Sequence, residues 1–442
     1  MGDIERVYPQ TMSDAVDNAL YVTAEQLRVG LYIHLDLHWT DHPFTFSSFK
    51  IKNQDQISTI HRLGLRRIRY EPARSDGKPL ALARQPAADE PVEAPSAPPP
   101  PPPGEAEAVT EKRERIEQLA RIRDEIREVE KKFQHASDTV KGILREAPIR
   151  PQESRRQAEK LVGHMVESII SRGSVLMHAI NGNVGEEAYV HSLNVAVLSL
   201  MLAKTLGFSA EETRHLGMGA MFHDIGKSDI PLWIVHKTEP LTRAEQAQME
   251  KHCALGAEIA KRLGLSIRAT EIILQHHEYA DGSGYPRGLT GDKLSPLSVI
   301  VAIVNTYDNL CNPPNVADAL TPHEALSHIF AVKRSKFQEL PLKAFIRCLG
   351  VYPPGSIVQL SNEMFGLVVS INPAKPLKPN VLVFDPDIPR DESVIIDMEK
   401  ESDLNISRSL RPGQLAREVY QYLSPRKRVT YYFDPKKQDQ PT

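Results

Sequence analysis

Histidine-bearing segments in the middle of the chain carry residue types that bind transition metals. Residues 276–286 read His-His-Glu-Tyr-Ala-Asp-Gly-Ser-Gly-Tyr-Pro, and residues 223–227 read His-Asp-Ile-Gly-Lys. His191 and His252 are two further histidines in the same region. Imidazoles and carboxylates suit divalent ions such as iron, manganese, nickel or zinc, and water on such an ion becomes a nucleophile near neutral pH. The pattern therefore indicates metal-dependent hydrolytic chemistry.

The two doublets stand where helices are expected to end. His223-Asp224 precedes Gly226, and His276-His277 precedes the glycine-rich turn at 282–284. Neighbouring residues within a helix project about 100° apart, so two adjacent ligands converge on one point only where the helix gives way. A lone histidine is more often a packed core residue than a ligand. Two doublets together with two single histidines are hard to explain by packing alone.

The elements that must position these residues are mainly helical. Residues from about 150 to 345 read as almost entirely helical, with turns that contain glycine or proline. Beyond residue 352 the pattern changes to short β-rich runs, as in a small barrel or meander, without catalytic spacing. The expected helices are 155–180, 188–206, 210–222, 242–263, 266–277, 296–310 and 322–333, and the expected β runs are 356–360, 366–371 and 380–384.

The N-terminal region reads as a small domain of mixed composition. We expect a strand at 32–37, a helix at 54–65 and a strand at 67–70. The aromatic residues of the intervening turn fit packing of a small domain better than a ligand site. They are Trp39, Phe44 and Phe46, together with Pro43.

Two further segments connect this domain to the histidine-rich region. Residues 82–107 are rich in Ala, Pro and Glu, with an unbroken proline run at 98–103 that is typical of a stiff spacer. Residues 109–134 carry apolar residues at three- and four-residue steps, which predicts a helix. This connector helix could pair with a copy of itself, carry a signal between domains, or cover the domain behind it. Its apolar positions are Ile116, Leu119, Ile122, Ile126, Val129 and Phe133.

Residues 187–310 resemble the HD-GYP phosphodiesterase family of the HD superfamily. The resemblance rests on His191-Ser192, residues 223–227, His252 before Gly256, and residues 276–286. Residues 20–72 also resemble the small uncharacterised domain often found ahead of HD-GYP domains. The resemblance implies hydrolysis of the bacterial second messenger cyclic di-GMP, to pGpG or onward to GMP, with two or three divalent ions, of which iron, manganese and nickel are favoured.

The implied fold is mainly α. It consists of an all-helical HD-superfamily catalytic domain, a small α+β N-terminal domain and a small β-rich C-terminal extension. The expected boundaries are 1–81 for the N-terminal domain, 82–107 for the linker, 108–147 for the connector helix, 148–350 for the HD-GYP domain and 351–442 for the extension.

The resemblance also assigns roles to individual residues. Asp224 should bridge two ions and act in catalysis together with Lys227, which should meet a substrate phosphate. Tyr285 and Arg287 should lie near the substrate, in a loop that also lies near partners such as diguanylate cyclases (GGDEF proteins). The implied metal ligands are Glu187, His191, His223, Asp224, His252, His276, His277 and Asn305, and Glu187 has Glu186 as a close neighbour.

The sequence departs from the family at the end of the site. Asn305 stands where relatives have an aspartate ligand, and a neutral amide should weaken metal affinity or change metal preference. Val299 replaces a commonly basic position, and residues 311–314 replace a segment where relatives often have Arg and Lys near the phosphates. Losing these cations removes contacts worth ~1.5–3 kcal/mol each. Arg287 or a cation of the connector helix could compensate.

Bulk properties fit a multidomain enzyme of the cytoplasm. The 442 residues allow two to four domains, and a net charge of −3 provides no overall field to recruit nucleic acid or an anionic membrane. No run approaches the ~18 consecutive apolar residues of a membrane helix, and the N-terminus lacks a secretory pattern. Three scattered cysteines, at 253, 311 and 348, fit a reducing compartment. We therefore expect no membrane insertion and no nucleic-acid partner.

Three functional hypotheses follow from the sequence. The first is a metal-dependent phosphodiesterase that hydrolyses cyclic di-GMP. The second is a degenerate HD-GYP domain that binds metal or nucleotide and serves as a signalling or protein-interaction module. The third keeps hydrolysis but changes the substrate to another cyclic dinucleotide or another phosphoester.

Overall fold

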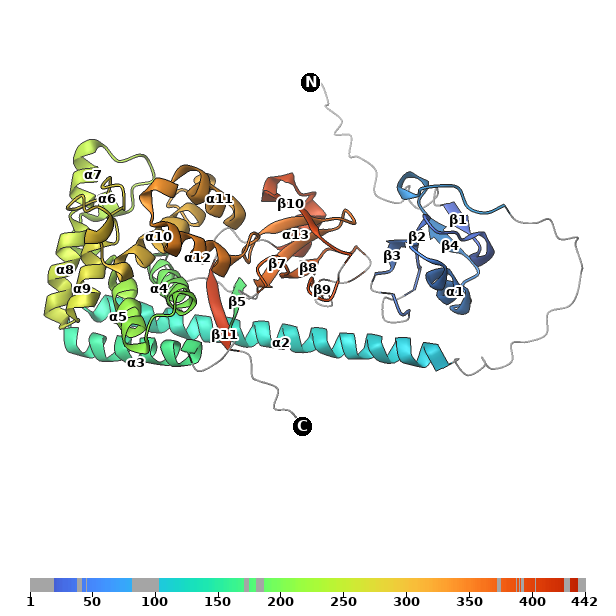
Figure 1. Cartoon of the computed structure of the whole chain (residues 1–442), viewed down its shortest axis with the longest axis horizontal. Coiled ribbons are helices and arrows are strands. Elements are labelled where there is room, and N and C mark those ends of the chain that lie inside the picture. The colour runs from blue at the N-terminus through green and yellow to red at the C-terminus, as the bar shows by residue number, and fades with distance from the viewer. Residues whose placement is uncertain are drawn as a thin grey trace, which may run out of the picture. The chain divides into compact units, whose positions relative to one another are not determined.

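The computed structural model describes residues 20–37, 42–44, 46–81, 103–170, 175–179, 187–371, 375–386, 388, 390, 393–401, 403–424 and 430–435. The chain divides into two compact units. The first contains residues 1–119 with 385–389, and the second contains residues 120–384 with 390–442. Figure 1 labels their helices and strands.

The first unit is a four-stranded antiparallel sheet with one helix. Its strands are β1 (Leu20–Val22), β2 (Tyr32–His34), β3 (Ser48–Lys50) and β4 (Ile68–Tyr70), in the order β1-β4-β2-β3. Helix α1 (Gln54–Arg62) begins where the Asn53 side chain accepts a hydrogen bond from the Gln56 backbone, and it buries Ile57 and Ile60. The predicted strands and helix are confirmed with shorter bounds. Trp39 lies outside the described residues.

Helix α2 (Pro103–Glu146) contains the predicted connector helix and is longer than predicted. Its C-terminal part contributes Val129, Phe133 and Val140 to the main core of the second unit. Since these residues lie four and seven positions apart, they share one face of the helix. This part of the helix therefore covers the domain behind it. The other four predicted seam residues, which precede Val129, have side chains outside the described part of the chain.

The second unit is a helical domain built around α4, whose positions from Ser192 to Ala203 are buried. Helices α3, α5, α10 and α12 pack against α4. Among the described residues, Ala188–Leu206 is the one stretch long and apolar enough to cross a membrane, and 72% of it is buried, as in a core helix. The helices are α3 (Pro151–Ile170), α4 (Glu187–Leu206), α5 (Ala210–Phe222), α6 (Leu232–Val235), α7 (Arg243–Met249), α8 (His252–Leu263), α9 (Ile267–Gln275), α10 (Pro296–Cys311), α11 (Pro322–Val332) and α12 (Glu339–Leu349), with the 3-10 helix η4 (Ile225–Asp229).

Three helix predictions in this domain were wrong. The predicted helix 155–180 ends at Ile170, and β5 (Val175–Ala179) follows it, because this apolar run pairs with two strands far along the chain. The predicted helix 242–263 is two helices, and the break places His252 at the start of α8. Helix α12 was not predicted, since Pro341 reads as a breaker but is tolerated in a first helical turn.

The C-terminal strands form an antiparallel sheet that incorporates β5. Its main order is β10-β6-β7-β5-β11, with β8 and β9 joined at β7 (Figure 1). Strand β11 returns to the helical domain, where Tyr431 and Tyr432 belong to the main core. The predicted mainly helical fold with small strand-containing regions at both ends is confirmed. The elements are β6 (Ile357–Leu360), β7 (Phe365–Ile371), β8 (Asn380–Val383), β9 (Ile395–Asp397), β10 (Ile406–Leu410), α13 (Arg417–Leu423) and β11 (Tyr431–Pro435).

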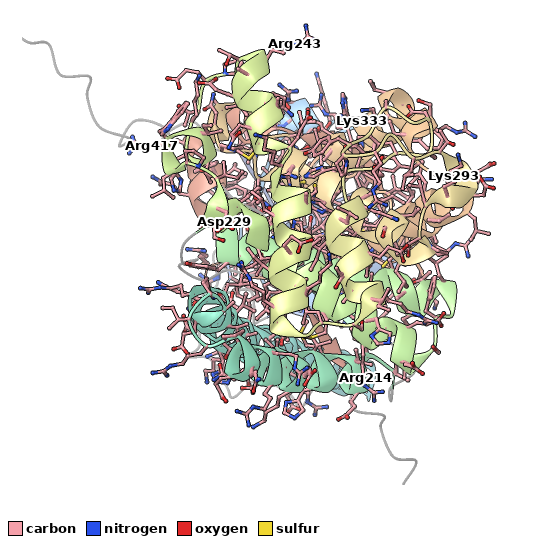
Figure 2. The ribbon with its side chains drawn as sticks, turned by 90° about the vertical axis from the view of Figure 1, so that its left-hand side faces the viewer. Arg214, Asp229, Arg243, Lys293, Lys333 and Arg417 are labelled. Carbon is pink, nitrogen blue, oxygen red and sulfur yellow. The ribbon has the colours of Figure 1, made fainter. Side chains whose placement is uncertain are left out.

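Charged side chains of the helical domain project from its surface, as Arg243 and Lys293 do in Figure 2. The core contains few titratable groups, and several of them are histidines: His223, His252 and His276 are almost fully buried. Burying such groups without partners is costly, so their presence in one region requires a local explanation.

Candidate metal centre

Five histidines and one aspartate from separate elements converge inside the helical domain. His191 comes from the first turn of α4, His223 and Asp224 from the end of α5, His252 from the start of α8, and His276-His277 from the end of α9. They form two groups, in each of which one ligand atom per residue lies within 4.8 Å of every other. One group is His191, His223 and Asp224, and the other is Asp224, His252, His276 and His277.

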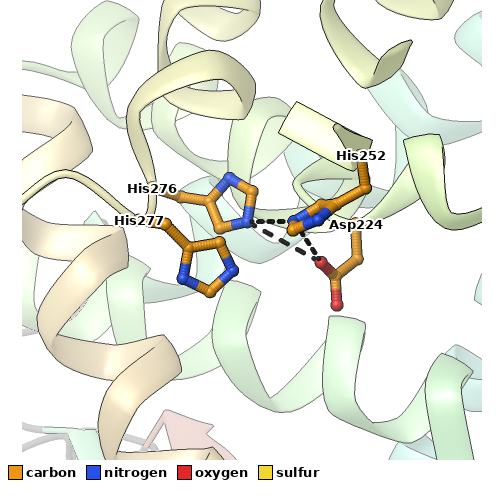
Figure 3. Close-up of side chains that lie close together, drawn as sticks. All are labelled: Asp224, His252, His276 and His277. Atoms are coloured by element: carbon orange, nitrogen blue, oxygen red, sulfur yellow. Dashed lines mark hydrogen bonds and ion pairs between the residues drawn. The ribbon is translucent and has the colours of Figure 1, made fainter. Parts of the chain in front are cut away.

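Asp224 is common to both groups and presents one oxygen to each. Its Oδ1 lies 3.4 Å from His252 Nε2 and 3.7 Å from His276 Nε2 (Figure 3). Its Oδ2 lies 3.5 Å from His223 Nε2 and 3.7 Å from His191 Nε2. A carboxylate with its oxygens directed at two sets of imidazoles has the arrangement that bridges two metal ions.

Hydrogen bonds to backbone carbonyls orient three of the histidine rings. The Nδ1 atoms of His223, His252 and His276 lie 2.6–2.8 Å from the carbonyl oxygens of the residues three positions earlier. Because a carbonyl oxygen only accepts, each Nδ1 carries the hydrogen and each Nε2 keeps its lone pair. Such a bond is the usual support for a metal-binding imidazole.

The protonation states of the group favour metal binding. Burial lowers the pKa of His223 and His277 well below the ordinary histidine value, and it lowers the pKa of His252 to about 4. Burial alone would raise the pKa of Asp224, but Lys227 and His223 outweigh it and hold this pKa well below its usual range. Neutral imidazoles beside an ionised carboxylate are the required forms of metal ligands.

The residues present fit divalent ions. Asp224 Oδ1 is buried and makes no hydrogen bond among the described residues. The Nε2 atoms of His252 and His276 face each other at 3.1 Å, as do those of His191 and His223. An orphaned carboxylate oxygen between facing imidazole nitrogens lacks what a cation supplies, so the cluster is compatible with a divalent metal site.

Close packing of two glycines brings the groups together. A Cβ atom on Gly226 would lie 2.0 Å from the carbonyl oxygen of His252 and 2.5 Å from the nitrogen of Gly256. Hence η4, which follows Asp224 directly, approaches the start of α8 at backbone distance. This contact explains how His252 reaches a carboxylate that is distant in sequence.

The other predicted site residues surround this cluster. Lys227 Nζ donates to Asp224 Oδ2 at 2.5 Å. Tyr285 stacks on His277, and Arg287 is exposed, with its backbone N–H donating to Glu278. Asn305 is buried on α10, and its Oδ1 accepts a hydrogen bond from Asn309. The Glu187 side chain lies outside the described part of the chain.

Two functional residues were missed from the sequence. Asp308 Oδ2 lies 2.6 Å from His191 Nδ1 and orients that ring, as the carbonyls orient the other three. Glu278 is buried and accepts hydrogen bonds from the backbone nitrogens of Arg287 and Leu289, which fixes the loop carrying Tyr285. Both carboxylates stand within or three residues after the motifs, and this nearness was the available signal.

Comparison with known proteins divides the chain into three matched regions. Residues 21–158 match a domain of unknown function (DUF3391), residues 159–339 an HD domain, and residues 357–418 a KOW domain associated with HD domains. The solved structure of Bd1817, an HDG"Y"P protein from Bdellovibrio bacteriovorus, is similar with a TM-score of 0.41 and 17% identity, over 74% of this chain and 98% of that chain. That TM-score is too low to carry an argument.

Curated relatives include several phosphodiesterases. The cyclic di-GMP phosphodiesterase PA4108 of Pseudomonas aeruginosa is 26% identical, over 82% of this chain and 84% of its own length. The cyclic di-GMP phosphodiesterase response regulator RpfG of Xanthomonas campestris is 34% identical, over 33% of this chain and 39% of its own. The 3'3'-cGAMP-specific phosphodiesterase 2 of Vibrio cholerae is 34% identical, over 34% of this chain and 30% of its own.

The helical fold and the His-Asp cluster define an HD-domain protein, the class that the matching model of residues 159–339 describes. Within that class, the paired histidines followed by Gly284-Tyr285-Pro286 place the chain in the HD-GYP family, as the sequence predicted.

Proposed function

We propose that this protein is a metal-dependent phosphodiesterase that hydrolyses cyclic di-GMP to pGpG or GMP in bacterial second-messenger signalling. The observation that carries the proposal is the bridging geometry of Asp224, whose two oxygens face separate groups of histidines. Relatives named as cyclic di-GMP phosphodiesterases support the choice of substrate.

In this proposal the site holds two divalent ions, and Asp224 bridges them. The chemistry that the ions supply when bound is activation of water and neutralisation of phosphate charge. His191 and His223 hold one ion, and His252, His276 and His277 hold the other. Iron, manganese and nickel are the favoured metals, because the donor set is mainly imidazole with one carboxylate. Glu187 is a candidate ligand for a third ion.

The chain's own residues orient the substrate. Lys227 lies three residues after Asp224, and its ammonium group is part of the same cluster. In this position it can donate to a phosphodiester oxygen on which negative charge grows during hydrolysis. Arg287 is an exposed cation on the loop after Tyr285 and compensates for the basic residues missing at 311–314. Tyr285 lines the same side of the site through its contact with His277.

Asn305 is proposed as a neutral oxygen ligand at the edge of the cluster. It is buried, so any interaction of its amide with an ion is shielded from water. A neutral ligand contributes less binding energy than a carboxylate, so the second ion should bind more weakly than in relatives with aspartate.

The remaining assignments concern the cellular setting. We place the protein in the cytoplasm, where its cyclic dinucleotide substrate is expected. The exposed loop around Arg287 is a candidate contact for diguanylate cyclases, and the N-terminal part of α2 is a candidate dimer seam.

Another cyclic dinucleotide is the second candidate substrate. The relative from Vibrio cholerae that is named as specific for 3'3'-cGAMP is 34% identical over 154 residues. A degenerate domain that binds metal without turnover is the third candidate, because Asn305 removes a charge from the site.

The test is a turnover assay on protein purified without oxygen and analysed for metal content. Cyclic di-GMP, cyclic di-AMP and 3'3'-cGAMP should compete as substrates, and cyclic di-GMP should give the fastest linear product. His223→Ala and Asp224→Ala should abolish turnover with the fold intact, whereas His164→Ala, on the exposed face of α3, should not. No linear product with iron, manganese or nickel would refute the enzyme, and indifference to cyclic di-GMP would refute its substrate.

A further inference from the structure

A row of hydrogen bonds connects the last described strand to a metal-binding histidine. The backbone nitrogen of Tyr431 donates to Asn194 Oδ1 at 3.1 Å, and Asn194 Nδ2 donates to Asp308 Oδ1 at 2.9 Å. The other oxygen of Asp308 accepts from His191 Nδ1 at 2.6 Å. Asn194, Asp308 and Tyr431 are all completely buried.

We propose that strand β11 is a positioning element of the metal centre, acting through Asn194 and Asp308 on the ring of His191. The C-terminal strand is then part of the catalytic domain. This inference rests on the metal-binding half of the proposed function and is independent of which nucleotide is hydrolysed.

The directions of the hydrogen bonds give the row its effect. A backbone N–H only donates, so the Asn194 side chain must turn its oxygen toward Tyr431 and its amide hydrogens toward Asp308. The carboxylate of Asp308 only accepts, so His191 must carry its hydrogen on Nδ1. The Nε2 lone pair of His191 is thereby directed at the space it shares with His223 and Asp224.

Strand β11 is held firmly enough to act in this way. It pairs with β5 from Tyr431 to Pro435 and also contacts α4. The hydroxyl groups of Tyr431 and Tyr307 are 2.7 Å apart in the core. Tyr431 therefore joins α4, which carries His191, to α10, which carries Asp308. Asn312 also donates to Asp308 Oδ1, at 3.0 Å, so the carboxylate keeps one donor without Asn194.

His191 differs from its neighbours in this dependence. His223, His252 and His276 are oriented by carbonyls three residues earlier in the chain, a contact that local structure provides. His191 is oriented by a side chain of another helix, 117 residues away. A disturbance of β11 should therefore affect the ion held by His191 and His223 and spare the ion held by His252, His276 and His277.

The test uses the full-length chain, stripped of metal and titrated with Mn²⁺, with bound ions counted by elemental analysis and followed by electron paramagnetic resonance. In Asn194→Leu we expect one of two ions to bind roughly 10–100-fold more weakly and the other to be unchanged. The shorter Asn194→Ser serves if the leucine variant does not fold. Ser199→Ala, at another buried position of α4, is the control and should keep both ions.

A second pair of variants isolates the strand itself. Tyr431→Pro removes the N–H that donates to Asn194, and proline is tolerated at the first residue of an edge strand. Tyr431→Ala also loses the ring but keeps the N–H, so it should retain the ion that Tyr431→Pro loses. Equal binding of both ions in all variants would overturn the positioning role, as would equal losses in the two Tyr431 variants. Wild-type protein that binds no Mn²⁺ would instead contradict the proposed function.

Discussion

The ring of Tyr285 stacks on the imidazole of His277, with ring centroids 4.6 Å apart and planes inclined by 22°. The tyrosine of the Gly-Tyr-Pro motif thus contacts a predicted metal ligand directly, in addition to the substrate role predicted for it. Glu278 fixes the loop that carries Tyr285 through two backbone hydrogen bonds. The motif is therefore partly a support for the second histidine of its own doublet.

Removing this stacking should weaken metal binding. In Tyr285→Ala we expect a loss of roughly 10–100-fold in Mn²⁺ affinity, the usual effect of losing a group that orients a metal ligand. Tyr285→Phe retains the ring and should bind Mn²⁺ almost as wild type does. Isothermal titration of metal-free protein measures both variants. A phenylalanine variant as weak as the alanine variant would assign the effect to the hydroxyl group instead.

The glycine contact between η4 and α8 should be intolerant of a methyl group. Because a Cβ atom on Gly226 would meet the His252 carbonyl at 2.0 Å, Gly226→Ala must move backbone and should cost at least about 2 kcal/mol. Metal binding should fall as well, since Asp224 and His252 separate. The matched control is Gly163→Ala in α3, where a Cβ atom meets nothing within 4 Å. It should stabilise the helix by ~0.5–1 kcal/mol, which thermal unfolding can measure.

Restoring the family carboxylate should strengthen the site. Asn305→Asp adds a negative charge at a buried position and keeps an oxygen to accept from Asn309. We expect roughly tenfold tighter metal binding, corresponding to ~1.4 kcal/mol, or faster turnover. Metal titration and a cyclic di-GMP assay test this. Loss of both affinity and turnover would show that the site is adapted to the amide.

Acid should destabilise the metal-free protein. Burial lowers the pKa of His252 from 6.5 to about 4, and it also lowers the pKa of His223 and His277. The unfolded chain therefore binds more protons than the folded chain in this range. Stability is fully present above the ordinary histidine pKa of 6.5 and is lost as the pH falls toward about 4.

Thermal melting at a series of pH values below neutrality measures this effect in metal-free protein. His252→Gln has no histidine to protonate at this position, so its melting temperature should depend less on pH in the same range. Identical pH dependence in wild type and variant would refute the assignment of the effect to His252.

The groups that converge on Asp224 could be predicted from the sequence, because adjacent ligands at helix ends are a local feature. The helix end at Phe222 and the break before His252 follow from short-range signals such as the Ser209 and Thr242 caps. The support of His191 could not be predicted in this way. Its partner Asp308 is 117 residues away, and the contact depends on how α4 packs against α10.

The β-rich region was predicted only in part, for the same reason. Its own runs were recognised by their alternation and turns. Residues 175–179 were taken as helix because their apolar side chains also suit a buried helix. Only pairing with β7 and β11 makes them a strand, and both partners lie far along the chain.

The central claim is a pair of ions bridged by Asp224, and a metal count tests it most directly. We expect two Mn²⁺ ions per chain in wild-type protein, with the magnetic coupling of a bridged pair in its electron paramagnetic resonance spectrum. His191→Ala should retain one uncoupled ion, held by His252, His276 and His277. A single uncoupled ion in wild-type protein under saturating Mn²⁺ would contradict the account.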